Sequence, residues 1–110
     1  MTEQAKKYLS DILRAIELIE QFTKATDHFN DYAADLKTQS AVERQLGIIG
    51  EAVNKIDQLF PDLSLENARK IVGFRNRLIH TYDAVDSSII WAIIKKHLPL
   101  LKKEIIDSLK

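Results

Sequence analysis

Arg75, Asn76, His80 and Tyr82 lie within a stretch of eight residues and carry a guanidinium, an amide, an imidazole and a phenol. An imidazole has a reference pKa of about 6.5, so it can take up and release protons at neutral pH. An arginine fork binds a phosphate through two hydrogen bonds and stabilises the charge that develops in a transition state. A neighbouring amide can orient either group. These residue types together suit the cleavage of a phosphodiester.

One helix is expected to carry all four residues, running from Leu65 to about Tyr82 with Ser64 as its N-cap. At about 100° per residue, Arg75 lies at the centre of an apolar stripe. The other members of that stripe are Ala68, Ile71, Val72, Leu78, Ile79 and Tyr82.

Asn76 and His80 fall one turn apart on the flank of that stripe, with Arg69 between them in angle. Gly73, close by, leaves room for another group to approach. Burying an unpaired guanidinium among apolar side chains costs on the order of several kcal/mol. A paired carboxylate offsets this cost. A purely structural interpretation is therefore an Arg75 ion pair with Glu43 or Glu51, with His80 as a boundary residue.

The remaining segments also have helical periodicity, and none has the alternation of a strand. Thr2 can cap a first helix that reaches Phe22. After the turn-rich residues 26–31, a second helix runs from about Asp35 to Leu59. Residues 83–85 form a loop before the last helix, which Asp86 or Ser87 caps and Pro99 is expected to kink. The prediction is one all-α domain over residues 1–110, an antiparallel four-helix bundle with a Pro-kinked last helix.

Composition excludes several classes of site. The 110 residues hold no cysteine, so disulfides, thiolate zinc sites and cysteine nucleophiles are excluded. His28, His80 and His97 are too widely spaced for a typical zinc motif, and no metal or other cofactor is expected. No glycine-rich phosphate loop is present. Gly47 and Gly50 match the spacing of a KH-domain loop, but they interrupt no helical stripe and more simply allow close helix packing.

No membrane span or signal peptide is expected, because no apolar run approaches the ~18 residues that a span requires and the first residues are polar. The expected location is the cytoplasm. The 16 basic and 16 acidic residues are unevenly distributed: residues 1–60 carry 7 basic and 10 acidic side chains, and residues 61–110 carry 9 and 6. Arg69, Lys70 and Arg77 are candidate RNA contacts, although a basic stretch is often only a solvated face.

The pattern R-N-x-x-x-H-x-Y, formed by residues 75–82, resembles the signature of the HepT-like branch of the HEPN superfamily. Two further blocks resemble the family, AVERQLGIIGEA at residues 41–52 and LPLL at residues 98–101. The resemblance covers essentially the whole chain.

This resemblance implies an all-helical, dimeric, metal-independent endoribonuclease that is the toxin of a toxin–antitoxin pair. Arg75 and His80 would be the catalytic pair, with Asn76 as the accompanying polar residue. The RNA 2′-hydroxyl would attack the adjacent phosphate and leave a cyclic phosphate and a free 5′-hydroxyl. The partner would be a minimal nucleotidyltransferase antitoxin (MntA-like), which adenylylates Tyr82 and so blocks RNA entry.

The residues themselves also favour a homodimer, because in-line transfer needs one group to accept a proton and another to donate one, and each chain has one histidine in the cluster. Two other functions fit the same residues. One is a non-catalytic partner subunit that binds nucleotide or substrate for a nucleotidyltransferase. The other is a structural dimerisation module with a buried Arg–Glu pair.

Overall fold

Helices form every regular element in the described part of the chain. The computed structural model describes the backbone of residues 1–63, 65–81 and 86–110, and the side chains of residues 1–63, 65–74 and 86–110. The elements are α1 (Glu3–Phe22), α2 (Phe29–Ala33), α3 (Leu36–Leu59), α4 (Glu66–Thr81), α5 (Ser87–Ala92), the π-helical turn η1 (Ile93–His97) and α6 (Leu98–Leu109). The predicted all-α class is confirmed. The predicted N-cap Ser64 and the predicted loop at residues 83–85 lie outside the described residues.

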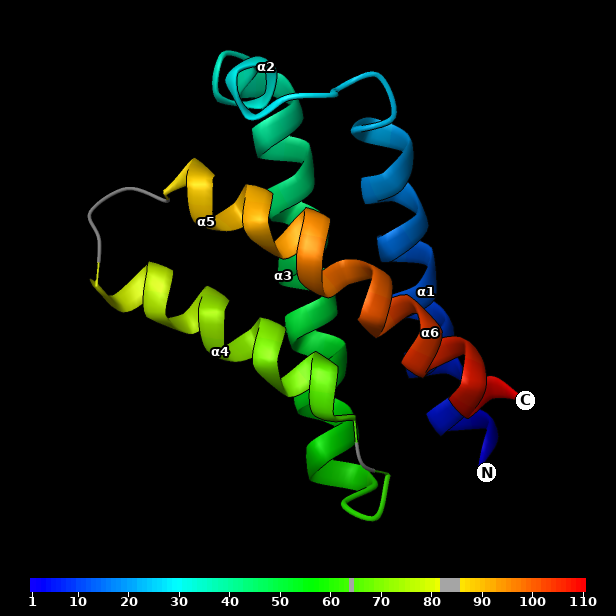
Figure 1. Cartoon of the computed structure of the whole chain (residues 1–110). Helices are drawn as coiled ribbons and strands as arrows, with labels where there is room; N and C mark the ends of the chain where they lie inside the picture. Colours follow the sequence, from blue (N-terminus) through cyan, green and yellow to red (C-terminus); the bar gives the residue numbers. More distant parts are fainter. Residues whose placement is uncertain (64, 82–85) are drawn as a thin grey trace.

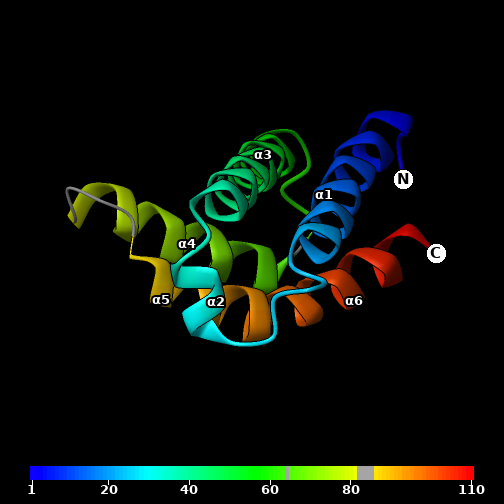
Figure 2. The ribbon, with the colours of Figure 1, turned by 90° about the horizontal axis from the view of Figure 1, so that it is seen from above.

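The four long helical segments form two antiparallel pairs that pack on each other (Figure 1). α1 and α3 make one layer, and α4 with the continuous path α5–η1–α6 makes the other, as Figure 2 shows from above. The predicted antiparallel four-helix bundle is therefore confirmed. The acidic and basic halves of the sequence correspond to these two layers, since residues 1–60 end just after α3.

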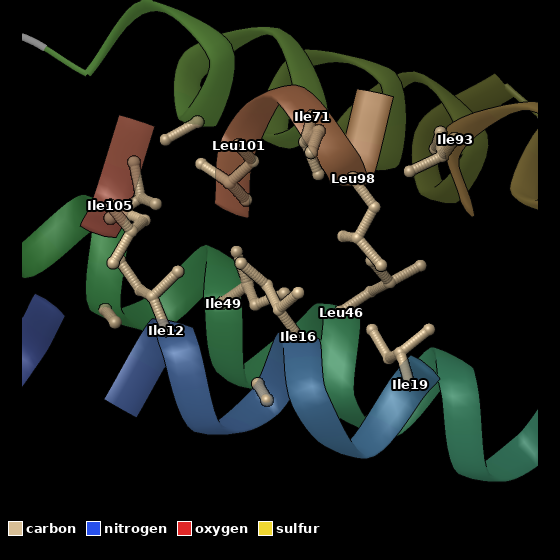
Figure 3. Packing of buried hydrophobic residues seen from close by; sticks show 14 of the residues in the cluster. Ile12, Ile16, Ile19, Leu46, Ile49, Ile71, Ile93, Leu98, Leu101 and Ile105 are labelled. Carbon is tan, nitrogen blue, oxygen red and sulfur yellow. The ribbon is translucent and has the colours of Figure 1, made fainter. Parts of the chain in front are cut away.

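The core lies between the two layers (Figure 3). Side chains from α1 and α3 meet side chains from α4, η1 and α6, and these core residues are at most 2% exposed; they include Ile12, Ile16, Ile19, Leu46, Ile49, Ile71, Ile93, Leu98, Leu101 and Ile105. Their spacing of three and four residues along each helix is the apolar stripe that the sequence predicted. Burial of this stripe fixes the rotation of each helix against the others.

Local capping explains where the helices of the first layer begin. The Ala5 N–H donates to the Thr2 hydroxyl at 3.0 Å, as predicted for the start of α1. The Thr38 N–H donates to the Asp35 carboxylate at 3.1 Å at the start of α3. Each cap satisfies a backbone donor that has no partner within the helix. Asp86 caps α5 through the Ser88 N–H in the same way.

The stretch predicted as a turn contains a short helix, α2. Tyr32, on α2, is fully buried, and its ring stacks on Trp91 with 5.4 Å between centroids. Trp91 is partly buried and packs against the core. This long-range aromatic contact, absent from the local turn signal, stabilises the added helical turn.

The last helical segment accommodates Pro99 through a π-helical turn. In η1 the Leu98 N–H donates to the carbonyl of Ile93, five residues earlier, and Pro99 lies in the first turn of α6. Pro99 has no N–H to donate to the preceding turn, and the π turn directly before it is where the hydrogen bonding departs from the regular α-helical pattern. The sequence predicted a kink at Pro99. The structure has an irregular turn, η1, just before this residue.

Candidate functional site

The motif residues Arg75, Asn76 and His80 lie on α4, which is one continuous helix through Thr81. Five residues along a helix correspond to about 7.5 Å of rise and about 140° of rotation, so the backbone positions of Arg75 and His80 are separated by these amounts along and around α4. Asn76 and His80, four apart, share a side. The side chains of residues 75–81 and all of Tyr82 lie outside the described part.

The start of α4 is held by a carboxylate from α6. The N–H of Asn67 donates to both oxygens of Glu104 at 3.2 Å, the Ala68 N–H donates to the same carboxylate at 3.4 Å, and the Asn67 side-chain amide adds a bond at 3.1 Å. A negative charge at a helix N-terminus is favoured by the unpaired N–H groups and the helix dipole. Sequence reasoning missed Glu104, because it lies 37 residues from Asn67.

The other end of α4 extends past α3 to one edge of the molecule in both views (Figures 1 and 2). A Cβ added to Gly73 would meet no described heavy atom within 4 Å, leaving aside its chain neighbours and the helix's own backbone. The predicted open approach at Gly73 is therefore present within this chain. It lies two residues before Arg75 on the same helix.

The next side chain, Phe74, rests on the imidazole of His97. The ring centroids are 4.9 Å apart and the planes are inclined by 50°, which is a typical tilted aromatic contact. Phe74 is partly buried against the core. The sequence analysis gave His97 no role, and no local spacing signals a contact between α4 and η1.

The candidate RNA contacts Arg69 and Lys70 are on the described part of α4, and each is about half exposed. Arg69 Nη2 is 3.3 Å from a carboxylate oxygen of Asp57 on α3, and Lys70 Nζ is 3.8 Å from Glu66. Exposed ion pairs of this kind contribute little, between about 0 and 1 kcal/mol. Both cations can therefore exchange a carboxylate for a phosphate at small energetic cost. The Arg77 side chain lies outside the described residues.

The two carboxylates considered for Arg75 differ in their position on α3. Glu43 is about 40° from Asp57 around the helix, on the side where Asp57 meets Arg69, whereas Glu51 is about 120° away. Glu51 is exposed beside α1, in a groove that Tyr8 and Lys55 also line.

Glu43 is partly buried, and this burial raises the pKa of its carboxyl group. No hydrogen bond or ion pair of Glu43 with a described residue is present. Glu43 is thus a partly buried carboxylate without a described hydrogen-bond or ion-pair partner, whereas Glu51 is exposed.

Gly47 and Gly50 lie inside the unbroken helix α3, which rules out a KH-type loop there. Among the described residues, no group of three His, Cys, Asp or Glu side chains could hold a metal ion. Within the same part of the chain, no helix is both long and apolar enough to cross a membrane.

Comparison with known proteins shows the family to which the chain belongs. Residues 12–107 match the family model of the "Ribonuclease HepT-like" proteins. A relative in Thermococcus cleftensis, named "Probable ribonuclease HepT", is 45% identical over 103 residues and 93% of each chain is covered. A solved structure of a tri-AMPylated Shewanella oneidensis HEPN toxin in complex with MNT antitoxin has the same fold, with a TM-score of 0.69, 21% identity, and 98% and 99% of the two chains covered. The chain belongs to the ribonuclease HepT-like family.

Proposed function

We propose that this protein is a metal-independent endoribonuclease, the toxin of a toxin–antitoxin pair. The observation that carries the proposal is the complete R-N-x-x-x-H-x-Y pattern at residues 75–82, inside the region that matches the ribonuclease family; its Arg, Asn and His lie on α4. The Thermococcus relative, named "Probable ribonuclease HepT", supports the same activity. The substrate is RNA, and the reaction takes place in the cytoplasm, where RNA and ATP are both available.

The reaction is an internal transfer at phosphorus. The 2′-hydroxyl loses its proton and forms a bond to the adjacent phosphorus, the bond from phosphorus to the 5′-oxygen breaks, and that oxygen gains a proton. The products are a 2′,3′-cyclic phosphate and a free 5′-hydroxyl. His80 transfers a proton, and Arg75 binds the phosphoryl oxygens as negative charge develops on them. The Asn76 amide orients one of these two side chains.

The active unit is a homodimer. A general base and a general acid are both needed, and each chain has one histidine in the motif. The backbone positions of Arg75 and His80 are also about 140° apart around α4, which favours a cleft built from two copies. A two-fold contact between the α4 helices of two copies supplies two arginines and two histidines to one cleft. The open space at Gly73 supports the approach of a second backbone there.

Arg69, Lys70 and Arg77 guide RNA toward that cleft through phosphate contacts, and this contribution weakens as salt rises. Glu43 and Glu51, on different sides of α3, are the two candidate carboxylates for support of Arg75, and both stay predictions from the sequence.

The proposed antitoxin is a minimal nucleotidyltransferase that transfers AMP from ATP to the Tyr82 hydroxyl and releases pyrophosphate. A phosphodiester and an adenine next to the motif would occupy the arginine and exclude RNA. The support comes from the Shewanella protein, which is a HEPN toxin that carries AMP groups and is bound by an MNT antitoxin.

The deciding experiment is cleavage of end-labelled tRNA and mRNA by the purified protein in excess EDTA. Intact mass first establishes that Tyr82 is unmodified. We expect cuts that leave cyclic phosphate ends, and their loss in His80→Ala by at least about 100-fold. The matched control is His28→Ala, which removes an exposed histidine at the start of α2 and is expected to cut normally.

No cutting by unmodified wild-type protein would overturn the proposal. The protein would then be the non-catalytic subunit that binds nucleotide or substrate for a nucleotidyltransferase, and His80→Ala would change only ligand affinity. If His80→Ala changed stability alone, the structural dimerisation module would be the correct description.

A further inference from the structure

The side chain that precedes the motif is anchored to another helical segment. Phe74, adjacent to Arg75, contacts the His97 ring at 4.9 Å between centroids. Phe74 also packs against the core. Beyond this residue α4 continues toward the edge of the molecule, away from α3 (Figures 1 and 2). The Phe74–His97 contact is therefore the last described side-chain anchor before the motif.

His97 reaches this position through an uncommon backbone feature. It is the final residue of η1, in which the chain makes one turn with five-residue spacing instead of four. An inserted residue of this kind rotates the side chains that follow it by about 100° relative to a regular helix. Without the π turn, a regular helix could not keep the present registers of both Ile93, in the core, and His97, against α4.

The described contact of His97 is between aromatic rings. The imidazole is partly exposed, and neither ring nitrogen has a hydrogen bond to a described residue; its contact is with Phe74. The other two histidines differ: His28 is exposed at the start of α2, and His80 belongs to the motif.

We propose that His97 is a positioning residue for the reaction, which holds α4 in the rotation that the motif requires. This inference rests on the proposed ribonuclease function. A helix that rotates about its own axis moves all its side-chain ends together, and the end of a long arginine moves furthest. In enzymes a misplacement of about 1 Å can lower a rate by roughly 100-fold. The Phe74 anchor, one residue before Arg75, limits this rotation directly beside the motif.

The kinetic test compares His97→Ala with His97→Phe. The alanine variant loses the ring contact, and we expect kcat to fall about 10-fold while KM stays within about twofold. The phenylalanine variant keeps an aromatic face against Phe74, and we expect it to restore kcat and to keep the wild-type pH profile of the reaction. His28→Ala is the matched control for loss of a histidine, with no expected change.

Two results would overturn the inference. If His97→Ala keeps the wild-type kcat, the contact does not position the motif. If His97→Phe is as slow as His97→Ala, or flattens one limb of the pH profile, the imidazole acts through its nitrogens and contributes to the chemistry itself.

Hydrogen exchange separates this inference from the proposed function, because it needs no cleavage. In His97→Ala the amides of residues 75–81 should exchange faster than in the wild type, while those of α1 are unchanged; His97→Phe should match the wild type. If wild-type protein does not cut RNA, the ribonuclease proposal fails and the exchange result still decides whether His97 holds α4. Equal exchange in all three proteins would reject the positioning role.

Discussion

The two layers of the bundle differ in how regular their helices are and in how those helices are capped. α1 and α3 are long, regular helices, each capped by a side chain at its own start, and their apolar stripes are nearly continuous. In the second layer, α4 is capped by Glu104 from another helix, has open space at Gly73, and contacts a π turn through Phe74. Departures from regular structure therefore collect around the helix that carries the motif, which is typical of functional sites.

This contrast indicates a division between stability and chemistry. The regular layer holds long runs of fully buried apolar side chains and none of the motif residues, so changes there should act on stability. The irregular layer carries Arg75 and His80, so changes there should act on activity. Four substitutions test this division.

The largest effect is expected for Ile49→Ala in the first layer. Ile49 is fully buried in α3, and the cavity left behind should lower the free energy of unfolding by about 2–5 kcal/mol. Urea unfolding followed by circular dichroism measures this loss. Leu36→Ala, at a position that is 74% exposed, is the control and should change it by less than about 0.5 kcal/mol. A loss below about 1 kcal/mol for Ile49→Ala would contradict the assigned core.

Arg75→Lys should have the next largest effect, and on activity. Lysine keeps the positive charge but loses the fork that binds two phosphate oxygens, so cleavage should fall about 100-fold. The melting temperature should stay within about 2 °C of the wild type. Arg14→Lys, on the exposed side of α1, should cut RNA at the normal rate. A melting temperature that falls as steeply as in Ile49→Ala would assign Arg75 a structural role instead.

Gly73→Ala should distinguish an effect on the stability of α4 from an effect on dimer formation. Within one chain the new methyl group meets no described atom within 4 Å, and alanine favours a helix interior by about 0.5–1 kcal/mol over glycine. The dilute protein should therefore melt at a higher temperature. If a second copy packs at this position, sedimentation should show a weaker dimer and cleavage should fall with it. An unchanged dimer would place the contact elsewhere.

The smallest effect is expected for Glu43→Gln. Burial raises the pKa of Glu43, so the folded state prefers the neutral carboxyl. Below the ordinary pKa both states are protonated and no penalty exists; the penalty appears as pH rises through the raised pKa of the folded state. At pH 7 the variant should therefore melt about 1 °C higher, and the difference should vanish at about pH 3. The exposed Glu51→Gln is the control.

A change in melting temperature of the opposite sign for Glu43→Gln would be equally informative. A lower melting temperature at pH 7 would show that the Glu43 carboxylate has a cationic partner in the folded protein. A double substitution with Arg75→Lys would then measure whether the two residues interact.

Sequence predicted the first layer well because its determinants are local. The spacing of Ile12, Ile16 and Ile19 indicates one buried face, and Thr2 signals the helix start within three residues. The chemistry of α4 was also visible, since residue types and spacing within eight positions identify the motif.

Other features could not be predicted, because they depend on contacts between distant segments. The Glu104 cap joins residues 37 apart, and the Phe74–His97 contact joins α4 to the π turn η1, two segments that are distant in the sequence. Tyr32 illustrates the same limit: its ring is buried by Trp91, which turns an apparent loop into a short helix. Likewise, the spacing of Arg69 in α4 gives no sign of its ion pair with Asp57.

Both chain ends lie on the same side of the molecule, near the end of α6, while the far end of α4 points to the opposite edge (Figure 1). The long dimension of the molecule is 42 Å. A tag, a surface linker or a fused domain at either terminus is thus kept away from the edge that carries the motif. Immobilised or fused forms of the protein should retain access to large substrates, and single-molecule measurements can tether the chain by either end.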